Sequence, residues 1–415
     1  MNAKPPTAPS DPQVNWLFLD LNSYFASCEQ QERPELRGRP IAIVQMLTDS
    51  TCAIAASYEA KAFGIKTGTA IWEAKKRCPD LILVKARHKL YVQYHHRIIE
   101  AVDTCLPVTK VCSIDEMACR LLGRERDVPT AQELAHKVKH TVRQRVGDCM
   151  TCSIGLAPNL FLGKVGSDMQ KPDGLVVITK NDLPVILHRL KLTDIYGIGA
   201  RMEHRLNRAG IGNVADLMSA SCSQLRQAWG GINGVLYYEL LHGADLQFPS
   251  SPHSKSISHQ HVLEPQLRTI DGARQFSQHL LTKAAERLRH QGYYCRRLGL
   301  SLSAADDNGR FWEETGFHET QDTDFMLARL TQLWKQAPPM KPIKVGVVLL
   351  GLIPAAQHQP DLFADNSQRQ KLSPLLDKIN QRYGRGAIGF GKPSEQIKQF
   401  TGHAAFQRVP EEFEF

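Results

Sequence analysis

Three carboxylates stand at the ends of apolar, strand-like runs. Asp115 and Glu116 are adjacent within VCSIDEMAC (residues 111–119), and Asp20 lies near the end of NWLFLDLN (residues 15–22). Buried carboxylates are costly unless they are paired, hydrogen-bonded or bound to a metal. Acids that bridge two cations about 3.5–4 Å apart can catalyse phosphoryl transfer. The pattern predicts a two-metal site, although spacing alone leaves open that these are unrelated acids at strand ends.

The geometry of a strand adds a condition to this prediction. Neighbouring side chains of a regular strand point to opposite faces of the sheet. Asp115 and Glu116 can therefore meet Asp20 together only if a turn or bulge lies near Asp115.

The segment after Asp20 could hold a phosphate. SYFASCEQQERPEL is a helical pattern that Asn22 or Ser23 could cap and that Pro34 would end. Free backbone amides at a helix start attract phosphate, and here they belong to Tyr24 and Phe25. No GxxxxGK[ST] loop occurs in the chain, so a P-loop nucleotide site is not expected.

A second segment has glycines suited to phosphate contact. Residues 193–218 read as a helix end, the turn Gly197–Ile198–Gly199 and a helix that begins near Arg201. Glycines allow positive φ and a close approach of backbone amides to a phosphate. The pattern is typical of a helix-hairpin-helix that contacts the DNA backbone without reading sequence, and an ordinary helical hairpin is the alternative.

Composition points to a basic protein of several domains. The 415 residues carry a formal net charge of +9, which favours a nucleic acid or a membrane surface as partner, or merely keeps the protein soluble. Residues 1–12 have no signal-peptide core and are expected to form a flexible leader. The late apolar run VGVVLLGLIPAA is too short to span a membrane. We therefore expect a cytoplasmic protein with no membrane partner.

The elements that would position these residues fall into blocks. Strands and helices alternate up to about residue 179, which indicates an α+β domain, and the pattern is helical from 182 to 242. Residues 256–351 read as strand, helix, strand, strand, helix, strand. A long helix before the acid pair has Tyr91, Tyr94, Ile98 and Val102 near one face, and the adjacent His95 and His96 are interpreted as surface or core residues.

Several separated motifs together resemble the Y-family translesion DNA polymerases of the UmuC/DinB superfamily. In chain order they are LFLDLNSYFASCEQ, ASYEAKAFGIKTG, SIDEM, CSIGLAPN, SDMQKPDG and YGIGARM. NSYFASCE and the tail look like the UmuC and ImpB/MucB/SamB branch, whereas SDMQKPDG looks more like the DinB branch. The resemblance covers residues 16–351 and is closest to ImpB-type sequences.

The resemblance implies an α+β fold shaped like a right hand. A flexible leader (1–12) would precede the palm, fingers, helix-hairpin-helix thumb, βαββαβ little finger and C-terminal tail of the family. By this likeness the parts are the palm (13–23 and 88–178), fingers (24–87), thumb (179–247), linker (248–253), little finger (254–352) and tail (353–415).

The resemblance also assigns roles to single residues. Asp20, Asp115, Glu116 and the backbone carbonyl of Leu21 match the family's ligands for two Mg²⁺ ions, for which Mn²⁺ can substitute, and the three acids match its catalytic residues. Phe25 matches the steric gate that excludes a ribose 2′-OH. The matches for nucleotide binding are Tyr24, Ser57, Tyr58, Lys61 and Lys171, and those for DNA binding are Gly197, Gly199 and Arg201.

Two positions depart from the family. Lys61 stands where many members carry arginine, and lysine lacks the planar fork that grips phosphate bidentately. Ala55 replaces a common threonine. Both departures bear on triphosphate affinity rather than on the metal site.

The implied function is template-directed, low-fidelity DNA synthesis past damage. Its partners would be primer–template DNA, deoxynucleoside triphosphates and UmuD-like or RecA-like accessory proteins. Gln359, Leu362 and Phe363 in QPDLF resemble the peptides with which bacterial polymerases dock on the sliding clamp. Two rivals remain at this stage, namely a non-catalytic scaffold linking DNA to the clamp and a two-metal nuclease.

Overall fold

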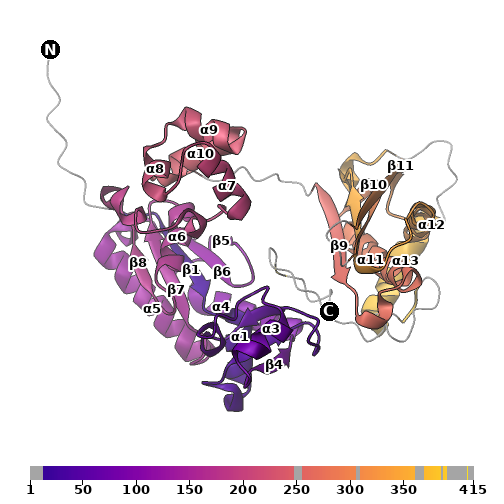
Figure 1. The fold of residues 1–415 in the computed structure, drawn as a ribbon, viewed down its shortest axis with the longest axis horizontal. Helices are drawn as coiled ribbons and strands as arrows, with labels where there is room; N and C mark the ends of the chain where they lie inside the picture. Colours follow the sequence, from indigo (N-terminus) through magenta and orange to yellow (C-terminus); the bar gives the residue numbers. More distant parts are fainter. Residues whose placement is uncertain are drawn as a thin grey trace. The chain divides into compact units, whose positions relative to one another are not determined.

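The computed structural model describes residues 13–246, 255–304, 309–359, 369–384, 387–389 and 409. The chain divides into two units, Met1–Pro249 with Gly402–Phe415 and Ser250–Thr401 (Figure 1). No helix within the described ranges is both long and apolar enough to cross a membrane. The predicted leader and linker lie outside the described residues.

A five-stranded sheet is the centre of the first unit. In sheet order its strands are β5 (Lys110–Val111), β6 (Glu116–Arg120), β1 (Trp16–Leu21), β7 (Cys152–Ala157) and β8 (Leu175–Val177). The central strand β1 runs antiparallel to both β6 and β7, and all six of its residues are buried. Its nearly continuous apolar run reflects cover on both faces of the sheet.

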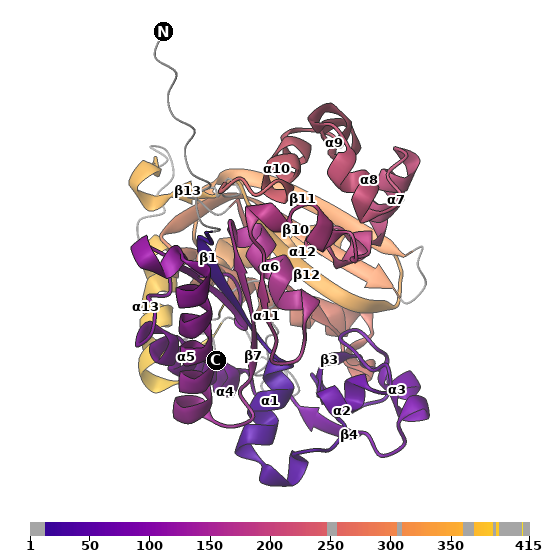
Figure 2. The same cartoon turned by 90° about the vertical axis from the view of Figure 1, so that its left-hand side faces the viewer.

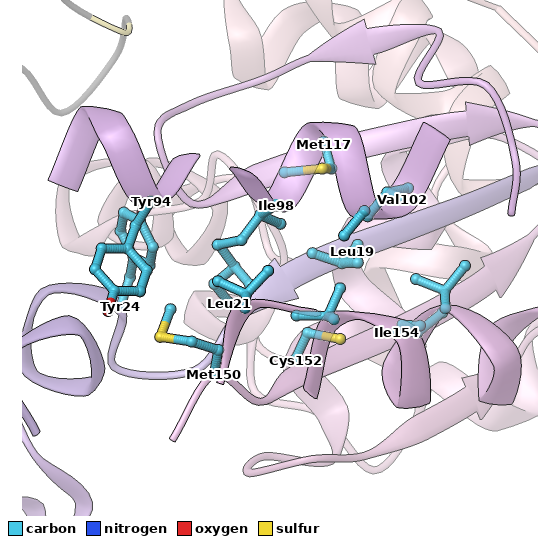
Figure 3. Close-up of a cluster of buried hydrophobic side chains, with 14 of the residues drawn as sticks. Leu19, Leu21, Tyr24, Tyr94, Ile98, Val102, Met117, Met150, Cys152 and Ile154 are labelled. Carbon is cyan, nitrogen blue, oxygen red and sulfur yellow. The ribbon is translucent and has the colours of Figure 1, made fainter. Parts of the chain in front are cut away.

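The two faces of β1 are covered by different helices. Leu17, Leu19 and Leu21 belong to a core shared with α4 (His88–Asp103) and α5 (Val128–Val146). Figure 3 shows part of this cluster, with Leu19 and Leu21 near Ile98 and Val102 of α4.

Trp16, Phe18 and Asp20 alternate with these leucines and therefore point to the other face of the sheet. Helix α6 (Leu160–Met169) covers this second face, opposite α5 (Figure 2). The polar end of β1 thus meets α6 rather than the large apolar core.

Helix α6 approaches the sheet closely because two glycines meet there. A Cβ on Gly155 of β7 would lie 2.0 Å from the carbonyl oxygen of Gly163 in α6. A Cβ on Gly163 would lie 3.0 Å from Cβ of Phe18 in β1. Side chains at these positions would push the helix outward, so the glycines set the distance between α6 and the end of β1.

Helix α1 (Tyr24–Glu32) follows β1 and ends before Pro34, as predicted. The expected side-chain cap was wrong: Ser23 has a left-handed backbone (φ 47°) and makes no capping hydrogen bond. Asn22 instead connects the end of β1 to β7 and to the turn at Asp173. Its side-chain amide donates to Ser153 Oγ and accepts the backbone N–H of Asp173.

A buried carboxylate joins α1 to α4. Glu29 is fully buried and accepts hydrogen bonds from the Tyr91 hydroxyl, at 2.8 Å, and from the guanidinium groups of Arg87 and Arg33. A buried charge with this many donors is compensated. The contact thus holds α1, the first helix after β1, against α4 of the central core.

A smaller three-stranded sheet follows α1. Its order is β3 (Ala53–Ala56), β2 (Ile41–Val44) and β4 (Ile82–Lys85), with the short helices α2 (Tyr58–Lys61) and α3 (Ile71–Arg77) between the strands in sequence. It has a small core of its own, formed by Ala42, Val44, Ala53, Ala56, Ala60, Ile65, Ile71, Ala74, Cys78 and Leu81.

Four short helices complete the described part of the first unit. They are α7 (Ala200–Arg208), α8 (Val214–Ser219), α9 (Cys222–Trp229) and α10 (Ile232–Leu241). The helix expected before the Gly-Ile-Gly turn is only a 3-10 helix, Leu192–Asp194. The α-helical hairpin is instead α7 and α8, joined by a second Gly-Ile-Gly at 210–212.

The second unit has the six elements predicted from its sequence. They are β9 (Ser256–Val262), α11 (Ile270–His290), β10 (Tyr293–Ala304), β11 (Arg310–Thr320), α12 (Thr323–Trp334) and β12 (Pro342–Leu350). The strands form an antiparallel sheet in the order β11-β10-β12-β9, and α11 and α12 share its apolar core.

Residues beyond Gly351 also contribute to this unit. Strand β13 (Ile353–Pro354) pairs with β10, and helix α13 (Arg369–Tyr383) is joined to α11 by the Arg289–Asp377 ion pair. The segment interpreted as a tail therefore begins by extending the second unit.

Candidate active site

The strand register brings two of the three predicted acids together. Asp20 of β1 lies directly opposite Glu116, the first residue of β6, so both side chains are on the α6 face of the sheet. The side chain of Asp20 is 7% exposed and that of Glu116 is 23% exposed.

Asp115 lies in the bend that precedes β6, which confirms the predicted turn. Its carboxylate accepts a 2.6 Å hydrogen bond from the Ser113 hydroxyl. Its carbonyl accepts the backbone N–H of Leu21 at 2.9 Å. The bend is thus attached to the end of β1, the strand that carries Asp20.

His95 supports this bend from α4. It is 2% exposed, and its Nδ1–H donates to the Ile114 carbonyl at 2.8 Å. Burial lowers the pKa of His95, so the ring is neutral near pH 7. Sequence reasoning gave His95 no role here, because nothing in the pattern signals a contact between a helix and a turn 19 residues away.

Two lysines form ion pairs with these carboxylates, and together they make up the acidic group of the site. Lys164 Nζ of α6 lies 2.6 Å from Asp20 Oδ2 and 2.9 Å from Glu116 Oε1. Lys171 Nζ, predicted from the family resemblance, lies 2.7 Å from Asp20 Oδ1. Asp168 contacts both, at 3.0 Å from Lys164 and 2.7 Å from Lys171.

Lys164 and Asp168 are residues that sequence reasoning missed. They are four residues apart on α6, and Lys171 follows Asp168 by three. The four-residue spacing places Lys164 and Asp168 on one side of α6, and Lys171 lies in the turn just after the helix ends at Met169. The pair on α6 is the signal that could have identified the group.

Burial and mutual repulsion control the charges of the site. Burial raises the pKa of Asp115, opposed by the Ser113 hydrogen bond, and the charge of Asp20 raises it further. Burial also raises the pKa of Glu116, and Lys164 only partly offsets this. Burial lowers the pKa of Lys164, but Asp20, Glu116 and Asp168 together raise it well above its usual range. The carboxylates are therefore short of positive charge.

The donor chemistry suits Mg²⁺, which prefers carboxylate, carbonyl and water oxygens. The positions of the side chains, however, leave no room for a metal ion between the carboxylates. Among the described residues no three acidic, histidine or cysteine side chains are arranged to hold an ion, and Lys164 lies between Asp20 and Glu116. The oxygens of the site fit the metal, provided that the ammonium group moves.

Tyr58 and Lys61 lie beside the acidic group. Lys61 Nζ is 4.3 Å from the centre of the Tyr58 ring. The pKa of Lys61 is lowered by partial desolvation and then by the charge of Lys171, while Asp20 raises it. Ser57 is 1% exposed and its hydroxyl caps α2 by accepting the Ala60 N–H, so its contact with a ligand would be indirect.

Phe25 is held by aromatic neighbours. Its ring stacks on Tyr91, with centroids 4.3 Å apart and planes at 13°, and meets the edge of His88. Tyr24 is 3% exposed, and its hydroxyl donates to the Tyr91 carbonyl at 2.6 Å. Tyr24 therefore offers a ligand its backbone amide rather than its side chain.

A cavity of about 280 Å³ adjoins the acids on the α6 face. Its walls are mostly apolar and include Phe18, Phe161 and Tyr196. Glu116 and Lys164 are among its polar members. An uncharged group of moderate size could lie here beside the carboxylates.

The Gly-Ile-Gly turn lies in the same unit. Gly197 has φ 83°, and a Cβ there would lie 1.8 Å from the Tyr237 hydroxyl oxygen, so glycine is required. Gly199 precedes α7 without any side-chain cap, and Arg201 in the first turn is exposed. The turn thus presents backbone amides and a cation together.

Only the first residue of the predicted clamp motif is described. The backbone N–H of Gln359 donates to the Glu319 carboxylate at 3.1 Å, and His358 donates to the same carboxylate at 2.7 Å. Leu362 and Phe363 lie outside the described residues.

Comparisons with known proteins identify two matching family regions. The impB/mucB/samB family matches residues 19–168, and the C-terminal domain of that family matches residues 254–362. DNA polymerase IV of Moorella thermoacetica is 33% identical over 380 residues, covering 90% of this chain and 94% of the relative. DNA polymerase IV of Pelotomaculum thermopropionicum is 32% identical, covering 90% and 93% respectively.

Solved structures give the same result. A chimera of the Y-family DNA polymerases Dbh and Dpo4 has a TM-score of 0.68 and 25% identity, covering 82% of this chain and 99% of that one. An insertion ternary complex of Dbh DNA polymerase has a TM-score of 0.55, with the same identity and coverage.

Proposed function

Since this chain belongs to the impB/mucB/samB family of Y-family translesion DNA polymerases and is a DNA-directed DNA polymerase, we propose that it extends primers at Asp20, Asp115 and Glu116. The observation that carries this proposal is the strand register that sets Asp20 opposite Glu116, with Asp115 in the adjoining bend, whose carbonyl accepts the backbone N–H of Leu21 at the end of β1. When bound, two Mg²⁺ or Mn²⁺ ions would supply Lewis acidity to the primer 3′-OH and neutralise the departing pyrophosphate. The Leu21 carbonyl would be a further ligand.

The nucleotide would be bound by groups around the acids. Lys171, Lys61 and Tyr58 provide charge and hydrogen bonds for a triphosphate. Backbone amides at the start of α1, which has no side-chain cap, would receive a phosphate oxygen. Phe25, braced against Tyr91, would form the wall beneath the sugar and exclude a 2′-hydroxyl.

The palm, fingers, thumb and little finger, divided as predicted, would together contact primer–template DNA. Gly197, Gly199 and Arg201 would hold the DNA backbone through amides and one cation. Small fingers would check the nascent base pair loosely, which suits synthesis past damage. UmuD-like or RecA-like proteins remain proposed accessory partners.

The tail is proposed to dock on the bacterial sliding clamp. Leu362 and Phe363 would fill an apolar pocket, as aromatic and aliphatic anchors do in small interfaces. Gln359 would add hydrogen bonds, and Glu319 holds its backbone at the edge of the second unit.

A primer-extension assay with Asp115→Asn tests the catalytic proposal. The substitution keeps the size of the side chain but removes a charge that the metals need. Extension should fall by about a thousandfold, while primer–template affinity should change little.

Asp80→Asn, at an exposed acid of the same unit, is the control and should extend normally. Extension by Asp115→Asn at the control rate would refute the assignment. A wild-type protein that binds DNA without extending it would point to the scaffold, and one that degrades the primer would point to the nuclease.

A further inference from the structure

We propose that Lys164 and Lys171 are internal counter-cations that occupy the catalytic carboxylates before metal binds, and that Asp168 retains both lysines when metal displaces them. The inference rests on the proposed function, because it concerns the same acids. It adds an order of events: metal entry frees two cations beside the site where a triphosphate would bind.

The first support is the occupancy of Asp20. Lys164 lies 2.6 Å from Oδ2 and Lys171 lies 2.7 Å from Oδ1, so each carboxylate oxygen already has an ammonium partner. Lys164 also reaches Glu116 at 2.9 Å. A divalent ion at these oxygens would have to take the place of the ammonium groups, so metal and lysine compete for the same atoms.

The second support is the charge balance. Asp20, Asp115, Glu116 and Asp168 carry four negative charges when ionised, and the two lysines carry two positive charges. A buried group of like charges is unfavourable without compensation. The lysines therefore keep the acids close together until metal supplies more positive charge.

The third support is the position of Asp168. Its Oδ1 lies 2.7 Å from Lys171 Nζ and 3.1 Å from Lys164 Nζ, and its Oδ2 lies 3.0 Å from Lys164 Nζ. Its side chain is 38% exposed, against 7% for Asp20. Each lysine thus has a second, more solvated partner, and it stays beside the site after it leaves Asp20.

The arrangement couples two ligands. Metal that neutralises Asp20 releases Lys171 for the triphosphate, and a bound triphosphate draws the lysines away from the acids and favours metal. Coupling of this kind is reciprocal between the two ligands. Asp168 is a positioning residue in this scheme, because it acts through the lysines.

The test measures the affinity of the full chain for Mn²⁺ in the absence of DNA and nucleotide. The electron paramagnetic resonance signal of free Mn²⁺ reports how much of the ion is unbound. Lys164→Met should bind Mn²⁺ about tenfold more tightly than wild type, because a competing charge is gone. Lys164→Arg should restore weaker binding. Asp168→Asn should weaken binding severalfold, because both lysines then depend more on Asp20.

Lys139→Met is the matched control. Lys139 is 15% exposed, against 13% for Lys164, and pairs with Asp173 at 3.0 Å rather than with the acids of the site. It should leave Mn²⁺ affinity unchanged. General damage to the fold would weaken metal binding, so the expected tightening separates competition from a merely structural role.

Equal or weaker Mn²⁺ binding by Lys164→Met than by wild type would overturn the proposal. If that variant does not fold, Lys171→Met should bind Mn²⁺ more tightly for the same reason, and equal or weaker binding by it would likewise overturn the proposal. A different result would reject the proposed function itself. If the three acids are not the metal site, wild type and Asp115→Asn would bind Mn²⁺ with the same affinity. Tight wild-type binding with no change on removal of the lysines would reject only the counter-cation role.

Discussion

At the scale of single residues, the packing of Phe25 determines what its removal would do. The ring is fixed by stacking on Tyr91 and by the edge of His88, and only 6% of the residue is exposed. A braced ring cannot swing aside for a bulkier sugar. If Phe25 is the steric gate, its rigidity is supplied by α4 rather than by its own helix.

Phe25→Ala should therefore raise the ratio of ribonucleotide to deoxynucleotide kcat/KM, by about a hundredfold. Removing the ring leaves space where a 2′-hydroxyl would otherwise collide. The measurement is single-nucleotide insertion kinetics with matched ribo- and deoxynucleotides. Because the readout is a ratio, it does not depend on the amount of folded enzyme.

Tyr24→Phe is the control for this prediction. It removes only the hydroxyl that donates to the Tyr91 carbonyl, so the ratio should stay at the wild-type value. An unchanged ratio in Phe25→Ala would place the gate at another residue.

At the scale of elements, Glu29 joins α1 to α4. The variant Glu29→Gln keeps the shape of the side chain but removes the charge that Arg87 and Arg33 contact. It should lower the free energy of unfolding by about 2 kcal/mol, measured by urea denaturation at pH 7. Glu73→Gln, at an exposed ion pair with Arg77, should cost less than about 0.5 kcal/mol.

The effect of Glu29 should also depend on pH. Burial raises its pKa, but hydrogen bonds from Arg87, Tyr91 and Arg33 outweigh burial and leave the pKa lowered. Its stabilising contribution is then complete above the unfolded value of about 4.3 and is lost as the pH falls through the lower folded value. The gap between wild type and Glu29→Gln should close in acid, and a constant gap down to a pH of about 2 would contradict this cause.

Helices and strands could be predicted from the sequence where the pattern of apolar residues within one segment determines them. The apolar run of β1, the helical face of α4 and the six elements of the second unit follow from periodicity. The bend at Asp115 followed from strand alternation and the need for both acids to converge. These features depend on neighbours in sequence.

The remaining features depend on contacts between distant segments. Lys164 reaches Asp20, 144 residues earlier in the chain, because Gly155 and Gly163 let α6 approach the sheet. His95 meets the Ile114 carbonyl only after α4 has packed. No local pattern encodes such distances, so the acids could be predicted from sequence, but the cations that contact them could be only partly identified.

At the scale of the whole molecule, the proposed clamp contact would give the enzyme an attachment beyond its grip on DNA. Leu362→Ala with Phe363→Ala should reduce affinity for a bacterial sliding clamp by at least about thirtyfold in a calorimetric titration, because two anchor side chains are lost. Primer extension without the clamp should be unchanged.

Leu372→Ala with Leu375→Ala is the control for nonspecific apolar contact. These leucines of α13 are 46% and 54% exposed, so they offer accessible apolar side chains outside the proposed motif. Equal clamp affinity in wild type and in the Leu362/Phe363 variant would exclude the motif as the main contact.

The small sheet of β2, β3 and β4 covers a core in which five of ten buried members are alanines. An alanine removes less apolar surface from water than leucine or isoleucine, so this core gains less free energy from burial. Its backbone amides should exchange with deuterium by local opening, well before those of β1 and β7. The region proposed to meet the nucleotide would thus open and reclose repeatedly while the central sheet stays folded.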